Sequence, residues 1–124
     1  MKEIDLDYEK IVGTWKLKDF SLVNENGDEI IWHGTCHGHL IYTSDKFVSA
    51  SINRVVDGER KDSFYFAEVS QISSNTVTHK ILECQDPERI GRSYIRSISW
   101  KDGHLALSGN GPSGQIKIIW ERVT

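Results

Sequence analysis

Three histidines and a cysteine lie within seven positions in the stretch HGTCHGH, which contains His33, Cys36, His37 and His39. Imidazole and thiolate groups bind zinc, but a structural zinc site needs four ligands, usually from two separated pairs. No second pair at that spacing occurs elsewhere in the sequence. We therefore predict no metal site and no cofactor. The stretch is expected to form a polar loop at the rim of the fold, with His39 near a ligand entrance.

His79 and Tyr42 are the first candidates for a buried polar site. His79 alternates with Val77 and Ile81, so a strand there directs the three side chains to one face. Tyr42 shares a face with Leu40 in the same way. Each has two interpretations: His79 is a core histidine bonded to a neighbouring strand or a proton-transfer group in a cavity, and Tyr42 is a core tyrosine or a hydroxyl facing a ligand.

Arg96 is the third candidate, because it alternates with Tyr94, Ile98 and Trp100 on a mostly apolar face. A buried arginine needs a partner for its charge. Glu68 is the nearest partner in type, and a bound carboxylate or enolate is the functional alternative. An ordinary surface arginine is the third possibility. The residues expected to bind the ligand are Tyr42, His79, Arg96, Trp100, Glu68 and His39. If the protein is an enzyme, Tyr42, His79 and Arg96 are the catalytic candidates.

Alternation of apolar and polar residues with period 2 predicts that short strands position these groups. Asn26-Gly27, Asp57-Gly58 and Asp102-Gly103 suit tight hairpin turns. One short helical segment is expected at 6–12, where it would plug one end of a barrel, and the glycine-rich stretch 108–114 is expected to form a wide hairpin. The predicted strands are 13–23, 29–33, 39–43, 46–56, 62–72, 75–84, 92–100, 104–108 and 114–123.

Eight to ten short strands in 124 residues leave edges exposed unless the sheet closes on itself. We therefore predict an all-β fold: one domain, residues 1–124, forming an antiparallel up-and-down β-barrel with room for one small ligand. A β-sandwich is the alternative.

The motif Gly13-x-Trp15, together with Arg122 in WERV, resembles the signature of the lipocalin and calycin barrels. The segments GHLIYTSDKFVSA, TVTHKI, IRSISWKDGHLAL and IIWERV follow in the order found in the bacterial lipocalin-like domain family, so the resemblance covers nearly the whole chain. It implies a barrel with an internal cavity. It also implies that Trp15 lies across the closed end beneath Arg122, which makes both residues structural.

Composition and charge restrict the classes of binding partner that are expected. The net charge of −3, with signs interspersed, provides no basic stripe for nucleic acid. The first ten residues lack the apolar core of a signal peptide, so a cytoplasmic protein with reduced cysteines is expected. No membrane association is expected, and the protein is predicted to be a monomer or homodimer.

Three hypotheses of function follow, and the sequence does not decide whether the protein is an enzyme. The first is binding of a small, mostly apolar or amphipathic molecule in the cavity. The alternative is an isomerase or cyclase acting on a small, reactive carbonyl compound such as a polyketide-like metabolite. In that case Arg96 and Tyr42 would stabilise negative charge on the carbonyl oxygen, and His79 would move a proton. A third hypothesis, a protein-interaction module on a barrel edge, requires a filled interior.

Overall fold

Nine strands make up most of the chain that the computed structural model describes, namely residues 7–23, 26–31, 36–111 and 114–124. Two single turns of 3₁₀ helix accompany them, η1 (Tyr8–Lys10) and η2 (Pro87–Arg89). The strands are β1 (Gly13–Val23), β2 (Glu29–Ile31), β3 (Cys36–Tyr42), β4 (Phe47–Val56), β5 (Glu59–Ile72), β6 (Thr76–Cys84), β7 (Ser93–Lys101), β8 (His104–Gly111) and β9 (Gly114–Arg122).

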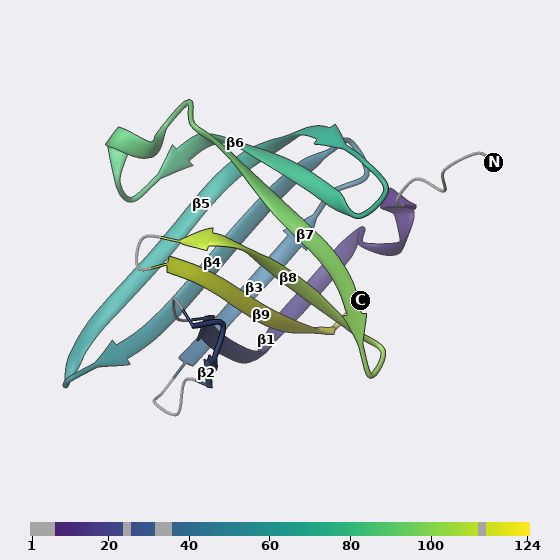
Figure 1. Cartoon of the computed structure of the whole chain (residues 1–124). Helices are drawn as coiled ribbons and strands as arrows, with labels where there is room; N and C mark the ends of the chain where they lie inside the picture. The colour runs from purple at the N-terminus through teal and green to yellow at the C-terminus, as the bar shows by residue number, and fades with distance from the viewer. Residues whose placement is uncertain (1–6, 24–25, 32–35, 112–113) are drawn as a thin grey trace.

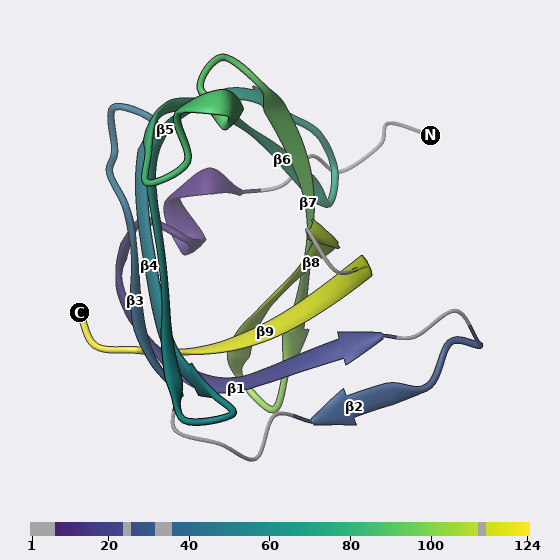
Figure 2. The ribbon, with the colours of Figure 1, turned by 90° about the vertical axis from the view of Figure 1, so that its left-hand side faces the viewer.

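The sheet closes because β1 pairs with strands from both ends of the chain. It pairs antiparallel with β3 along Gly13–Lys16 and with β9 from Trp15 to Val23. All other neighbours are consecutive antiparallel strands from β3 to β9. Eight strands therefore form the ring, and β2 pairs only with the far end of β1, outside the ring (Figures 1 and 2). The predicted all-β, up-and-down barrel is confirmed.

Two hairpins have the turn chemistry that the sequence predicts. Asp57 and Gly58 join β4 to β5 with φ of 51° and 81°, and Asp102 and Gly103 join β7 to β8 with φ of 51° and 80°. Positive φ at both central residues is the requirement of a type I′ turn, whose twist matches that of the flanking strands. These aspartate-glycine pairs fix where two of the long hairpins turn.

The hairpin between β8 and β9 differs from the prediction. The wide hairpin expected at 108–114 is wrong, because the ladder continues through Asn110↔Gln115 to Gly111↔Gly114. Glycine keeps its backbone N–H and C=O and pairs like any other residue. Residues 112 and 113 lie outside the described part of the chain.

Trp15 and Arg122 form the closed end in the way that the resemblance implies. The guanidinium carbon of Arg122 lies 4.1 Å from the centroid of the Trp15 ring. Arg122 also donates to the carbonyls of Val12 at 3.1 Å and Thr124 at 3.0 Å, and to that of Lys10. Trp15 is 1% exposed. The pair therefore ties the first strand of the barrel to the last.

Helix η1 packs against this end, as a plug formed by a single turn within the predicted segment 6–12. Tyr8 and Ile11 are buried, and the Tyr8 hydroxyl donates to the carbonyl of Thr43 at 2.8 Å. The Ile11 carbonyl accepts a hydrogen bond of 3.0 Å from the Trp15 indole N–H. The closed end is thus apolar, and the polar groups of Tyr8 and Trp15 in it are hydrogen-bonded.

Candidate functional site

A cavity of about 420 Å³ lies within the barrel. This volume falls in the range of roughly 300–1,000 Å³ that small-molecule sites occupy. Most of its wall is apolar because the inward positions of the surrounding strands carry hydrophobic side chains. The apolar lining residues are Phe20, Leu22, Leu40, Ala50, Ile52, Leu107, Ile116, Ile118 and Trp120.

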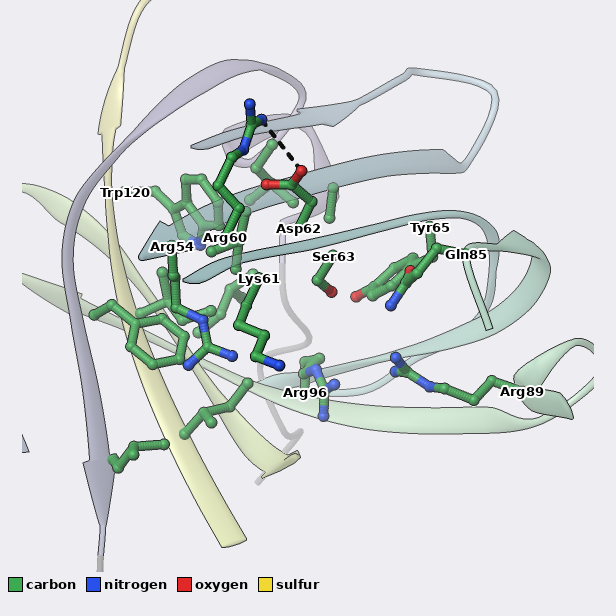
Figure 3. Close-up of a pocket in the computed structure, with 18 residues that line it drawn as sticks. Arg54, Arg60, Lys61, Asp62, Ser63, Tyr65, Gln85, Arg89, Arg96 and Trp120 are labelled. Atoms are coloured by element: carbon green, nitrogen blue, oxygen red, sulfur yellow. Dashed lines mark ion pairs between the residues drawn. The ribbon is translucent and has the colours of Figure 1, made fainter. Parts of the chain in front are cut away.

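The polar part of the wall is rich in cations. Figure 3 shows these side chains, which come from the β4–β5 hairpin, from η2 and from β7. At the hairpin, Arg60 pairs with Asp62 at 3.2 Å, and Lys61 pairs with Glu59 at 3.5 Å outside the cavity. The polar lining residues are Arg54, Arg60, Lys61, Asp62, Ser63, Tyr65, Gln85, Arg89 and Arg96.

Tyr42, His79 and Tyr65 form a buried hydrogen-bonded chain. The Tyr42 hydroxyl lies 2.8 Å from His79 Nε2, and the Tyr65 hydroxyl lies 2.7 Å from His79 Nδ1. Burial, with a smaller contribution from the positive charge of Arg96, lowers the pKa of His79 from 6.5 to about 3. His79 is therefore neutral at physiological pH, with one donor nitrogen and one acceptor nitrogen.

The direction of this chain follows from its buried end. Among the described residues, His79 is the hydrogen-bond partner of the Tyr42 hydroxyl, and Tyr42 is fully buried. If Tyr42 accepted from His79, its own proton would be buried without an acceptor, at a cost of roughly 1–3 kcal/mol. Tyr42 therefore donates to Nε2, and Nδ1–H donates to Tyr65. This leaves the hydroxyl proton of Tyr65, a residue of the cavity wall, available to a ligand.

Both tyrosines remain protonated. Burial raises the pKa of Tyr42 well above its ordinary value of 10.0. Burial also raises the pKa of Tyr65, against the opposing effect of the Arg96 guanidinium, which lies close enough to hydrogen-bond to it. The chain therefore presents a neutral O–H donor beside a cation.

Arg96 is buried in the cavity wall, with 6% of its surface exposed. Its Nη1 donates to the Asn110 carbonyl at 3.1 Å, and its guanidinium carbon lies 5.4 Å from the centroid of the Tyr94 ring. Gly109 on β8 makes room for it, because a Cβ there would lie 2.5 Å from Arg96 Nη1. No carboxylate from the described chain forms an ion pair with Arg96.

Of the residues that the sequence predicts for the site, the structure brings Tyr42, His79 and Arg96 together. His79 shares the inward face with Val77 and Ile81, as predicted. Tyr42 and His79 lie behind Tyr65 rather than on the cavity wall.

The other three predicted residues lie elsewhere. Glu68 is exposed and faces outward, because the inward positions of β5 are those of Ala67 and Val69 on either side of it. It therefore does not pair with Arg96. Trp100 is 46% exposed and packs against Trp15, with ring centroids 6.2 Å apart. His39 is exposed on β3.

Tyr65, Trp120 and Arg89 belong to the site, although the sequence did not single them out. Tyr65 alternates with Ser63 and Ala67, and this run of small side chains beside a tyrosine is the signal that a cavity faces that side of β5. Trp120 is 1% exposed, and its Nε1 has no hydrogen-bond partner within the described chain. No sequence pattern predicts such an unpaired N–H group.

The histidine-rich stretch is partly strand and not only a rim loop. β3 begins at Cys36, which pairs with Arg54 on β4, so His37 and His39 are exposed strand residues. His33 lies outside the described residues. Across the ranges that the structure describes, no three His, Cys, Asp or Glu side chains are placed to hold a metal ion together. Cys36 and Cys84 are free thiols.

Comparison with known protein families, with curated proteins and with solved structures finds no match to this chain. Within the described residues, no helix has the length and apolar character needed to cross a membrane. The fold itself is that of an eight-stranded antiparallel barrel compatible with the calycin architecture. The geometry of the cavity must therefore carry any functional argument.

Proposed function

We propose that the protein binds a small, mostly apolar molecule inside its barrel. The observation that carries this proposal is the cavity of about 420 Å³, whose mostly apolar wall holds the buried guanidinium of Arg96 and the hydroxyl of Tyr65. A buried guanidinium whose N–H groups are not all bonded carries a desolvation cost, and an acceptor atom on a ligand in the cavity would offset it. Membership of the lipocalin-like family is part of the same proposal, and the contact between Trp15 and Arg122 supports it.

The proposal is tested by filling the cavity. Ala50 lines it, whereas the next residue, Ser51, alternates to the other side of β4. The variant Ala50→Phe is expected to weaken binding of a neutral apolar fluorophore, N-phenylnaphthylamine, at least tenfold, and the matched variant Ser51→Phe is expected to leave it unchanged. Equal binding by both variants, or no binding by the wild type, contradicts the proposal.

One observation favours the isomerase or cyclase hypothesis as a second candidate. The chain from Tyr42 through His79 holds the Tyr65 hydroxyl as a hydrogen-bond donor, so Tyr65 could stabilise the negative charge that develops on a carbonyl oxygen when a buffer base removes the neighbouring α-proton. Tyr65, rather than His79, would contact the reacting molecule. This candidate predicts that the protein catalyses exchange of deuterium from solvent into a long-chain methyl ketone, and that Tyr65→Phe abolishes the exchange. Exchange at the rate of buffer alone contradicts it.

A further inference from the structure

The polar groups on the cavity wall are mainly hydrogen-bond donors. Tyr65 offers its hydroxyl proton, and Arg96 has five N–H groups, of which one is bonded to the Asn110 carbonyl and another is close enough to bond to the Tyr65 oxygen. Two of the acceptors on the wall, the Asp62 carboxylate and the Gln85 amide oxygen, are already engaged. Asp62 accepts from Arg60 and Asn53, and the side-chain oxygen of Gln85 accepts from the backbone N–H of Phe64. The cavity is therefore complementary to a molecule that supplies acceptors.

The charge of the cavity wall also favours a ligand that supplies acceptors. Five cationic side chains and one carboxylate line the cavity, in a chain whose net charge is −3. The deepest cation is Arg96, which is buried without an ion-pair partner from the described residues. Arg89 lies near it, since both guanidinium carbons border the Tyr94 ring, at 4.9 and 5.4 Å from its centroid. Two like charges close together in a partly buried wall are stabilised by an anion between or beside them.

We propose that the ligand is an amphipathic carboxylic acid whose carboxylate is bound by the Arg96 guanidinium and the Tyr65 hydroxyl, while its apolar body lies along the wall formed by β1, β4, β8 and β9. This inference rests on the proposed function and names the ligand class of the same cavity. A planar guanidinium binds a carboxylate with two parallel hydrogen bonds, and the tyrosine hydroxyl adds a third donor. The donors of Tyr65 and Arg96 then meet acceptors without any movement of the barrel.

The opposite orientation of Tyr65 would not serve this purpose. A tyrosine that donated to His79 would turn its oxygen lone pairs toward the carboxylate and repel it. The buried hydroxyl of Tyr42 determines the direction instead, because it donates to His79 and leaves His79 to donate to Tyr65. Tyr42 and His79 therefore act as positioning residues for the donor of Tyr65.

The test compares three ligands with the same ten-carbon body: decanoate, decanol and decylammonium, titrated calorimetrically into the full-length protein at neutral pH. Decanoate is expected to bind at least tenfold more tightly than decanol, and decylammonium more weakly than either. The variant Arg96→Met is expected to remove the preference for decanoate while retaining decanol binding. That retained binding also shows that the variant is folded. Arg92→Met removes an exposed arginine that does not line the cavity and is expected to preserve the preference.

Each other outcome overturns a specific claim. Equal binding of decanoate and decanol by the wild type, or a preference that survives Arg96→Met, overturns the carboxylate inference and leaves the proposed function standing. Binding of none of the three ligands overturns the proposed function, and the inference with it. A preference lost equally in Arg92→Met assigns the effect to overall charge and also overturns the inference.

Discussion

Two arginines of this barrel each lie near an aromatic ring, but they differ in how many backbone carbonyls accept hydrogen bonds from them. Arg122 at the closed end lies over Trp15, and Arg96 in the cavity wall lies near the ring of Tyr94. Arg122 donates to three backbone carbonyls, whereas one carbonyl accepts from Arg96 at 3.1 Å. Arg122 is exposed to solvent, which can hydrate its remaining N–H groups, and Arg96 is buried.

This difference distinguishes an arginine that stabilises the fold from one that binds a ligand. A guanidinium whose donors are met by the backbone joins strands, and its loss is felt as a loss of stability. A buried guanidinium with donors left over adds little to stability, because its desolvation offsets its contacts, but it binds an anion strongly. The comparison therefore predicts that variants at the closed end change the free energy of unfolding, and that variants in the cavity wall change binding.

The largest effect is expected from Trp15→Ala. It removes a fully buried ring from the closed end and should lower the free energy of unfolding by about 3–5 kcal/mol in urea titrations. Trp100→Ala is the matched control, because Trp100 packs against the same ring but is half-exposed, and it should cost less than half as much. Equal costs would show that the closed end does not depend on the buried tryptophan.

Acidification should destabilise the protein through His79. The folded state keeps His79 neutral down to a pKa of about 3, whereas the unfolded chain protonates it below its ordinary pKa of 6.5. The unfolded state therefore binds more protons in this window, and the stability that is complete above pH 6.5 is lost as the pH falls toward 3. The slope approaches about 1.4 kcal/mol per pH unit below pH 6, which gives about 2.3 kcal/mol between pH 6.5 and 4.5.

His79→Gln is the control for this titration, because glutamine also offers one donor and one acceptor without titrating. The difference in the free energy of unfolding between wild type and variant should shrink by that amount on acidification over the same range. Parallel pH profiles for the two proteins would contradict the burial of a neutral histidine.

Gly13→Ala tests the backbone at the closed end. Gly13 has a φ of 138°, and a Cβ there would lie 2.5 Å from the Thr124 carbonyl oxygen and 2.8 Å from Arg122 Nη1. Gly91 also has a positive φ, 89°, but nothing lies within 4 Å of its missing Cβ. Gly91→Ala should cost roughly 1–2 kcal/mol from φ alone, and Gly13→Ala should cost at least about 1 kcal/mol more. Urea titrations that give equal costs would refute the steric role of Gly13.

The smallest effect, and the sharpest contrast, comes from replacing each arginine by methionine. Arg122→Met should lower the free energy of unfolding by about 1–2 kcal/mol, since it removes exposed hydrogen bonds and a cation–π contact. Arg96→Met should change it by less than about 1 kcal/mol, because no ion pair is broken. If thermal and urea melts show the larger loss in Arg96→Met, Arg96 is part of the scaffold.

Much of the fold was predictable because local chemistry decides it. The aspartate-glycine turns fix the hairpins, the period-2 alternation marks the strands, and Gly13, Trp15 and Arg122 mark the closed end. It was harder to predict which face of β5 points into the barrel. Phe64 and Phe66 make one face of that strand more hydrophobic than the face of Ser63 and Tyr65, yet the first face is outside. A strand that lines a cavity has small inward residues, which reverses the usual relation between hydrophobicity and burial.

The candidate site was predictable only in part for the same reason. Alternation grouped Tyr42, His79 and Arg96 with apolar neighbours on their strands, but it could not show which faces point inward or that Tyr65 stands between His79 and the cavity. Trp120 was not singled out from the sequence, and its unpaired N–H is visible only when every neighbouring strand is in place. Hydrogen-bond satisfaction depends on contacts between strands distant in sequence.

The most direct test of the account is a native mass spectrum of the protein purified from its own host. We expect a bound small acid in the wild type and in Arg92→Met, and its loss in Arg96→Met. A spectrum with no bound molecule in the wild type, or with the same molecule retained in Arg96→Met, would contradict the claim that the buried arginine of this cavity recognises a ligand.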